Sequence, residues 1–146
     1  MLTATLIALT LTAAPPTPDA AKSVIDFFYH GQGQAPVLVE GVLCKDVEKK
    51  KKETKFDCNE AFGPDASKGE TVNVHLTYLV PKGDEKELMI QAVHEGVVRA
   101  TKDVKIKGQG LRTRTWRAFT LKKEGKWEFK VLDGATVLKT FTIAAQ

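Results

Sequence analysis

The feature that most constrains the fold is a series of short segments in which apolar and polar residues alternate. Thr71–Val80 is the clearest of them, with apolar side chains at every second position: Val72, Val74, Leu76, Tyr78 and Val80. Because successive side chains of a β-strand point to opposite faces, this spacing predicts a strand with one buried face. Similar segments recur about every ten residues and do not alternate with helical patterns, which predicts an antiparallel β-sandwich.

Hairpin turns are predicted at Glu95-Gly96 and at Asp133-Gly134, the stronger of the two signals, because two-residue turns favour glycine. The strands predicted besides Thr71–Val80 are Val37–Leu43, Leu88–His94, Val97–Lys102, Val104–Lys107, Arg112–Leu121, Trp127–Leu132 and Thr136–Ala144. With about seven or eight strands and no internal repeat, residues 37–146 are expected to form one all-β domain.

The N-terminal 36 residues differ in character from this domain. Leu2–Ala14 is apolar and uncharged, ends in small residues, and is followed by a cluster of prolines. It resembles a secretory signal peptide and is too short to span a membrane, which takes about 20 apolar residues. We therefore expect residues 1–14 to be a signal peptide, the protein to be periplasmic or secreted, and no permanent membrane anchor to be present.

Residues 15–36 are expected to form a linker with room for one short helix. Ala20–His30 fits a helix, with Asp19 as its N-cap and Gly31 as its C-terminal stop. Val24–Tyr29 is also rich in residues that favour an extended edge strand, so the pattern leaves both structures open.

The two cysteines, Cys44 and Cys58, predict a disulfide, because an even pair in a small exported protein is most simply a bridge. The bridge would close a loop of about fifteen residues around a polar segment and contribute on the order of 3 kcal/mol. The alternative is a metal site completed by His75 or His94. No C-x-x-C or H-x-x-x-H spacing supports that site, and we expect no bound metal.

Patterns that would indicate catalysis are sparse. The histidines, His30, His75 and His94, fall where surface or boundary positions are expected, and Ser23 and Ser67 lie outside any G-x-S-x-G motif. No G-x-G-x-x-G motif follows a strand, so no nucleotide cofactor is expected. We predict that the protein is not an enzyme. The alternative is an envelope enzyme or enzyme inhibitor with a site on a loop, using His75 or His94.

The strongest binding candidate is the segment Arg112–Arg117. Alternation places Arg112, Arg114 and Trp116 on one face of a strand and Arg117 on the other. Guanidinium groups beside an indole can bind carboxylates or phosphates and stack on a sugar or an aromatic group. The structural alternative puts Trp116 in the core and pairs the arginines with acidic residues across the sheet.

A run of four lysines, Lys49–Lys52, is a second candidate, for anionic lipid or lipopolysaccharide, although a lysine run in a loop is usually just solvated. The net charge of +4 favours anionic partners in general. Nucleic acid is not expected as a partner, because aromatic residues do not interleave with the lysines.

The C-terminal half also carries a family resemblance. The basic strand Arg112–Arg117 is followed by a G-x-W-x-x-x-V segment from Gly125 to Val131, by Asp133-Gly134, and by an F-x-I ending at Ile143. In this order the motifs resemble small exported immunoglobulin-like domains of functionally uncharacterised bacterial proteins. The resemblance covers about Thr71–Ala144, and it implies an immunoglobulin-like sandwich without implying an activity.

Together these observations predict a non-enzymatic module of the cell envelope that acts in binding or structure. Its partner would be an envelope protein or an anionic glycan or lipid, recognised through a sheet face or an edge strand. The binding residues predicted are Arg112, Arg114, Trp116 and Arg117.

Overall fold

The computed structural model describes residues 17–29, 37–80, 84–108 and 110–146. The predicted signal peptide at 1–14, most of the linker at 15–36, His30 and the predicted helix stop at Gly31 lie outside the described residues. The side chains of residues 20, 27–29 and 110–112, which include the side chain of Arg112, are also outside the description.

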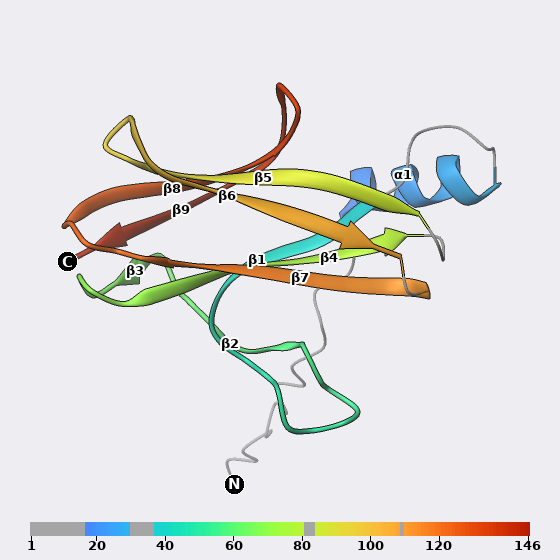
Figure 1. Cartoon of the computed structure of the whole chain (residues 1–146), viewed down its shortest axis with the longest axis horizontal. Helices are drawn as coiled ribbons and strands as arrows, with labels where there is room; N and C mark the ends of the chain where they lie inside the picture. Colours follow the sequence, from blue (N-terminus) through green and yellow to red (C-terminus); the bar gives the residue numbers. More distant parts are fainter. Residues whose placement is uncertain (1–16, 30–36, 81–83, 109) are drawn as a thin grey trace, which may run out of the picture.

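Two β-sheets lie face to face and enclose the core (Figure 1). Sheet A has the strand order β2-β1-β4-β7, and sheet B has the order β3-β9-β8-β5-β6. Their bounds are β1 Val37–Val47, β2 Cys58–Ala61, β3 Asp65–Ala66, β4 Thr71–Val80, β5 Glu85–His94, β6 Val97–Lys107, β7 Gly110–Thr120, β8 Gly125–Asp133 and β9 Thr136–Ala145. The predicted all-β sandwich is confirmed. Its strand pairs are antiparallel except for the short parallel pair β3–β9.

Apart from shifts in strand ends, the strands differ from the prediction at β2, β3 and β6. β2 and β3 were not expected, because four and two residues are too few to show alternation. β6 runs unbroken through Asp103, where two separate strands were predicted. Asp103 is exposed on an edge strand, so its polar side chain does not interrupt the pairing with β5.

The N-terminal segment is a helix, α1, Pro18–Tyr29, and not an edge strand. The carbonyl of Thr17 accepts the first helical hydrogen bond, from the backbone N–H of Ala21, so Thr17 holds the N-cap position that was predicted for Asp19. Pro18 takes the first helical position, where its missing N–H costs nothing. Asp19 lies in the first turn, where its negative charge interacts favourably with the helix dipole.

The core is built from the inner faces of both sheets. On β4, the predicted apolar face is confirmed, since all five of its alternating side chains are at most 1% exposed. The Tyr78 hydroxyl accepts a hydrogen bond from Thr115 Oγ1 at 3.2 Å, and burial raises the pKa of the Tyr78 phenol. From sheet B the core takes buried residues that include Ile90, Val104, Trp127, Phe129, Val131 and Ile143.

The absence of a side chain at Gly41 allows β1 of sheet A and β9 of sheet B to lie close together at one side of the sandwich. A Cβ at Gly41 would lie 2.5 Å from Cζ of Phe141 and 3.1 Å from Cδ2 of Leu76. The ring of Phe141 therefore fills the space that a side chain at position 41 would need.

Candidate functional site

The predicted disulfide between Cys44 and Cys58 is confirmed. It joins β1 to β2 within sheet A, whereas the disulfide of antibody domains joins the two sheets. The bridge closes off the segment between these strands, of which Glu48–Asp57 is here called the disulfide loop. Two backbone hydrogen bonds close the base of this loop, from Glu48 N to Asp57 O at 2.8 Å and from Phe56 N to Glu48 O at 2.7 Å.

The end of the disulfide loop packs on the outer face of sheet A. His75 of β4 points to this face, and its Nε2–H donates a hydrogen bond to the carbonyl of Phe56 at 2.7 Å. Phe56 has a φ of 70°, a left-handed conformation that costs about 1–3 kcal/mol for a bulky residue. The contacts of the loop with the sheet hold Phe56 in that conformation.

Arg114 and Trp116 of β7 lie beneath this end of the loop. The Trp116 ring is 5.3 Å from the Phe56 ring and 6.4 Å from the nearly parallel His75 ring, between ring centroids. Arg114 Nε is 2.6 Å from Asp57 Oδ1, and the two side chains are only 17% and 27% exposed. The face on which Arg114 and Trp116 were predicted to bind a partner is thus partly covered by the protein's own loop.

Arg117 points to the other face of β7, toward the gap between the two sheets. Its Nε donates to the carbonyl of Asp103 on β6 at 2.9 Å, and its Nη1 donates to its neighbour's carbonyl, that of Trp116. Lys102 of β6 reaches back toward β7, where it donates to the carbonyl of Ala118 and lies over the ring of Phe119. These inward-pointing charges connect the two edge strands and use carbonyls that an added strand would need.

A groove of about 290 Å³ runs between the edges of β6 and β7. It is here called the edge groove, and its lining residues are Phe56, Lys105, Lys107, Thr113, Arg114, Thr115 and Trp116. Arg114 is already paired with Asp57, and Lys107 lies 3.4 Å from Glu85, so Lys105 supplies most of the unpaired positive charge of the groove. The edge groove therefore combines aromatic rings, hydroxyl groups and cationic groups.

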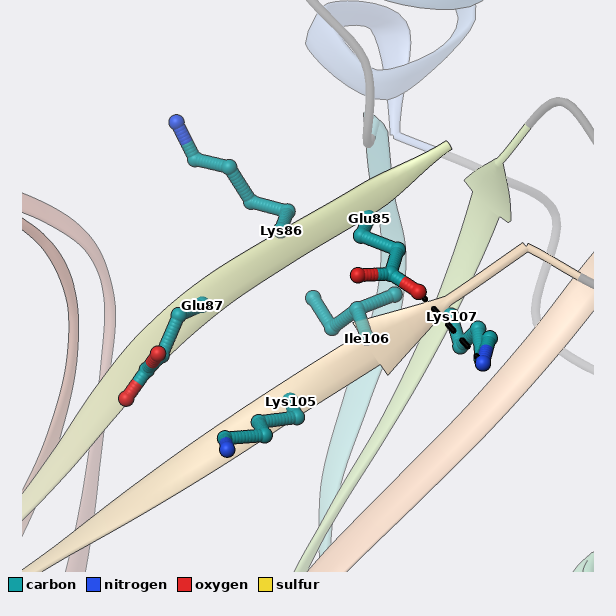
Figure 2. Close-up of a pocket in the computed structure, with 6 residues that line it drawn as sticks. All are labelled: Glu85, Lys86, Glu87, Lys105, Ile106 and Lys107. Carbon is teal, nitrogen blue, oxygen red and sulfur yellow. Dashed lines mark ion pairs between the residues drawn. The ribbon is translucent and has the colours of Figure 1, made fainter. Parts of the chain in front are cut away.

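A second hollow, of about 410 Å³, adjoins the edge groove on β5 and β6 and shares Lys105 and Lys107 with it. Figure 2 shows Glu85 turned toward Lys107, with Nζ and Oε1 3.4 Å apart, while Lys86 points away from both. Lys86 pairs instead with Asp133 at 3.1 Å. Acidic and basic side chains alternate here and largely balance one another, so this hollow is less suited to a charged ligand.

Both described histidines are buried, which corrects the expectation of surface or boundary positions. His75 is 5% exposed because the disulfide loop covers it. His94, at the end of β5, is 7% exposed, with its ring centroid 4.8 Å from that of Trp127. Its Nε2–H donates to the carbonyl of Glu124 at 2.7 Å, so both imidazoles hold neighbouring backbone in place.

Sequence reasoning missed the role of Glu48. Its Oε1 accepts hydrogen bonds from the backbone N–H groups of Lys50 at 2.6 Å and Lys51 at 3.1 Å, and its Oε2 accepts one from Asn59 at 3.2 Å. These bonds to the ionised form lower the pKa of Glu48 to about 2. Glu48 lies two and three residues before the backbone N–H groups that it binds, a spacing at which a carboxylate can close a turn. In the sequence this spacing was overlooked, because Glu48 stands next to four lysines and was considered only for its charge.

Two further properties concern only the described part of the chain. It contains no cluster of three or more His, Cys, Asp or Glu side chains placed to hold a metal ion. None of its helices has the length and apolar character needed to cross a membrane.

Comparisons with known proteins match the chain to solved structures. No family model matches the chain, and no curated protein matches it. Among solved structures, the chain is similar to an immunoglobulin-like protein from Pseudomonas aeruginosa, with a TM-score of 0.47 and 10% sequence identity. The match covers 73% of this chain and 92% of the other.

Proposed function

We propose that this protein is a non-enzymatic binding module of the cell envelope, exported to the periplasm or secreted, which holds an anionic polymer in the edge groove. The observation that carries the proposal is the lining of that groove, where Lys105 and Lys107 accompany the rings of Phe56 and Trp116. Ammonium groups attract carboxylates or phosphates, and an aromatic face packs against a sugar ring. An acidic glycan offers both kinds of partner.

The surroundings of the groove support a preformed site. Trp116 packs on the rings of Phe56 and His75, and Arg114 is paired with Asp57, so both side chains have little freedom to lose on binding. The disulfide holds the loop that supplies Phe56, and disulfides are typical of exported proteins. Arg117, which serves the contact between the sheets, is not part of this proposed site.

The test is retention on an immobilised carboxylated polysaccharide, polygalacturonate, with neutral dextran as the control matrix. The wild type is expected to bind polygalacturonate only, with affinity that falls steeply as salt rises from about 50 to about 500 mM. The variant Lys105→Gln, Lys107→Gln is expected to lose binding. The variant Lys68→Gln, Lys123→Gln removes the same charge elsewhere and is expected to keep it.

Equal losses in the two double variants would refute the edge groove as the site. Capture of an envelope protein with an affinity that salt barely changes would indicate a largely apolar protein interface, and the anionic polymer would then be the wrong ligand. Circular dichroism of each variant checks that it still folds.

A further inference from the structure

We propose that the tip of the disulfide loop is a separate contact site for a membrane surface that carries anionic phospholipid. The tip is defined as Lys49–Lys55 and contains five lysines and a single acidic residue, Glu53. The proposal does not depend on the edge groove, because the residues concerned are different.

The lysines of the tip are available for an external partner. All residues from Lys49 to Lys55 are exposed. Among the described residues, no carboxylate lies within ion-pair distance of Lys49, Lys50, Lys51 or Lys52. Lys55 lies over the ring of Phe56, 5.0 Å from its centroid. The positive charge of the tip is therefore not balanced within the part of the chain that the structure describes.

Glu48, the acidic residue next to the lysines, is occupied elsewhere. Its carboxylate is hydrogen-bonded to the backbone N–H groups of Lys50 and Lys51 and to the side chain of Asn59, and the attraction of the Lys51 charge is the smallest of the causes that lower its pKa. It thereby shapes the turn that carries the lysines, and the ammonium groups remain on the outside. Together with the disulfide and the contacts of Phe56 and Asp57 on sheet A, this carboxylate makes the loop a fixed projection.

The shape of the loop suits a flat surface. Figure 1 shows the segment between β1 and β2 extending away from the two sheets, at the bottom of the view. A convex projection can reach a membrane surface without obstruction from the rest of the domain. A leaflet with anionic headgroups attracts clustered lysines within about a Debye length.

The residue types favour a membrane over other anionic partners. The lysine ammonium is a compact point charge, suited to a diffuse layer of headgroups, whereas paired recognition of individual phosphates favours arginine. The tip itself contains no aromatic residue that could stack on nucleic acid bases. A surface with five lysines and no apolar centre also differs from the usual centre of a protein interface.

The test is co-sedimentation of the oxidised full-length protein with vesicles of neutral phosphatidylcholine, or of phosphatidylcholine mixed with phosphatidylglycerol. The wild type is expected to bind only the anionic vesicles, and less so at high salt. Each lysine near such a surface strengthens binding by about fivefold, so replacing Lys49–Lys52 with Gln is expected to weaken it by roughly several hundred-fold. A control variant loses the same charge by replacing Lys68, Lys122, Lys123 and Lys139 with Gln, and it is expected to bind nearly as the wild type does.

Three results would overturn the proposal: no binding of the wild type to anionic vesicles at low salt, equal binding to neutral vesicles, or equal losses in the loop and control variants. Binding to soluble dextran sulfate without binding to vesicles would likewise assign the tip to a soluble polyanion. The groove variant Lys105→Gln, Lys107→Gln is expected to keep most of its vesicle binding, which distinguishes failure of this proposal from failure of the edge groove. Circular dichroism and a titration for free thiols confirm that each variant is folded and oxidised.

Discussion

Reduction of the Cys44–Cys58 disulfide is expected to destabilise the protein by about 3 kcal/mol. The two cysteines are 14 residues apart, and closing a loop of about 15 residues removes about 10 cal/mol/K of entropy from the unfolded chain. At 25 °C this corresponds to about 3 kcal/mol, a large part of the 5–15 kcal/mol that is typical of a whole domain. With a urea m-value of about 1.5–2 kcal/mol/M, the unfolding midpoint should fall by roughly 1.5–2 M.

Reduction is expected to act mainly by increasing the entropy of the unfolded chain, while the folded structure changes little. After reduction, three other contacts still hold the disulfide loop: Phe56 on Trp116, His75 on the carbonyl of Phe56, and Asp57 beside Arg114. The folded protein should therefore keep its near-ultraviolet circular dichroism, to which Trp116 contributes, while its stability falls.

The assay compares urea unfolding of the oxidised protein and of the same protein kept in reductant, which leaves both cysteine side chains in place. The variant Cys44→Ala, Cys58→Ala is a second comparison. It should be slightly less stable than the reduced protein, because Cys44 is fully buried and its sulfur would be lost. An unchanged midpoint on reduction would refute the loop-closure argument. Loss of native tertiary signal before any urea is added would show that the bridge also maintains the folded state.

Three further results are expected. Gly41→Ala should destabilise the domain by about 1–3 kcal/mol in thermal or urea unfolding, because its Cβ would lie 2.5 Å from the Phe141 ring; an unchanged stability would contradict the tight packing there. The pKa of Glu48 is lowered from 4.5 to about 2, so its ionised form stabilises the fold above pH 4.5, and this contribution is lost as the pH falls toward 2. Glu48→Gln should flatten that part of a stability–pH curve, and an unaltered curve would show that its hydrogen bonds add nothing. Phe56→Ala should expose Trp116 and shift its fluorescence to longer wavelength with little loss of stability; an unshifted spectrum would mean that Phe56 does not cover the indole.

Most of the fold could be predicted, because a buried strand face and a tight turn each depend on residues that are neighbours in the chain. The alternation in Thr71–Val80 gave the bounds of β4 and its buried face, and Glu95-Gly96 gave the β5–β6 turn, where both residues have positive φ. The alternation in β7 also placed Trp116 and Arg117 on opposite faces, and their partners in β4, His75 and Val74, show this arrangement. The short strands β2 and β3 lay beyond such reasoning, since pairing with distant residues forms them.

Only part of the candidate site could be predicted from such local patterns. Arg114 and Trp116 are brought together in the edge groove with Lys105 and Lys107, which lie on another sheet. Arg117 is directed to the gap between the sheets, and the side chain of Arg112 lies outside the described residues. The proximity of β6 to β7 depends on how the two sheets stack, and no spacing within one strand contains that information.

The amino-acid sequence by itself determined the elements that depend on neighbours in the chain: the strands with one apolar face, the glycine turns, and a disulfide with only one pairing open to it. The tertiary structure alone decided what covers each face. His75 is buried and Trp116 is half-covered because a polar loop folds back over an outer sheet face. That arrangement depends on contacts between residues far apart in the chain, such as Phe56 with Trp116 and Asp57 with Arg114, which form only when the sheets have assembled.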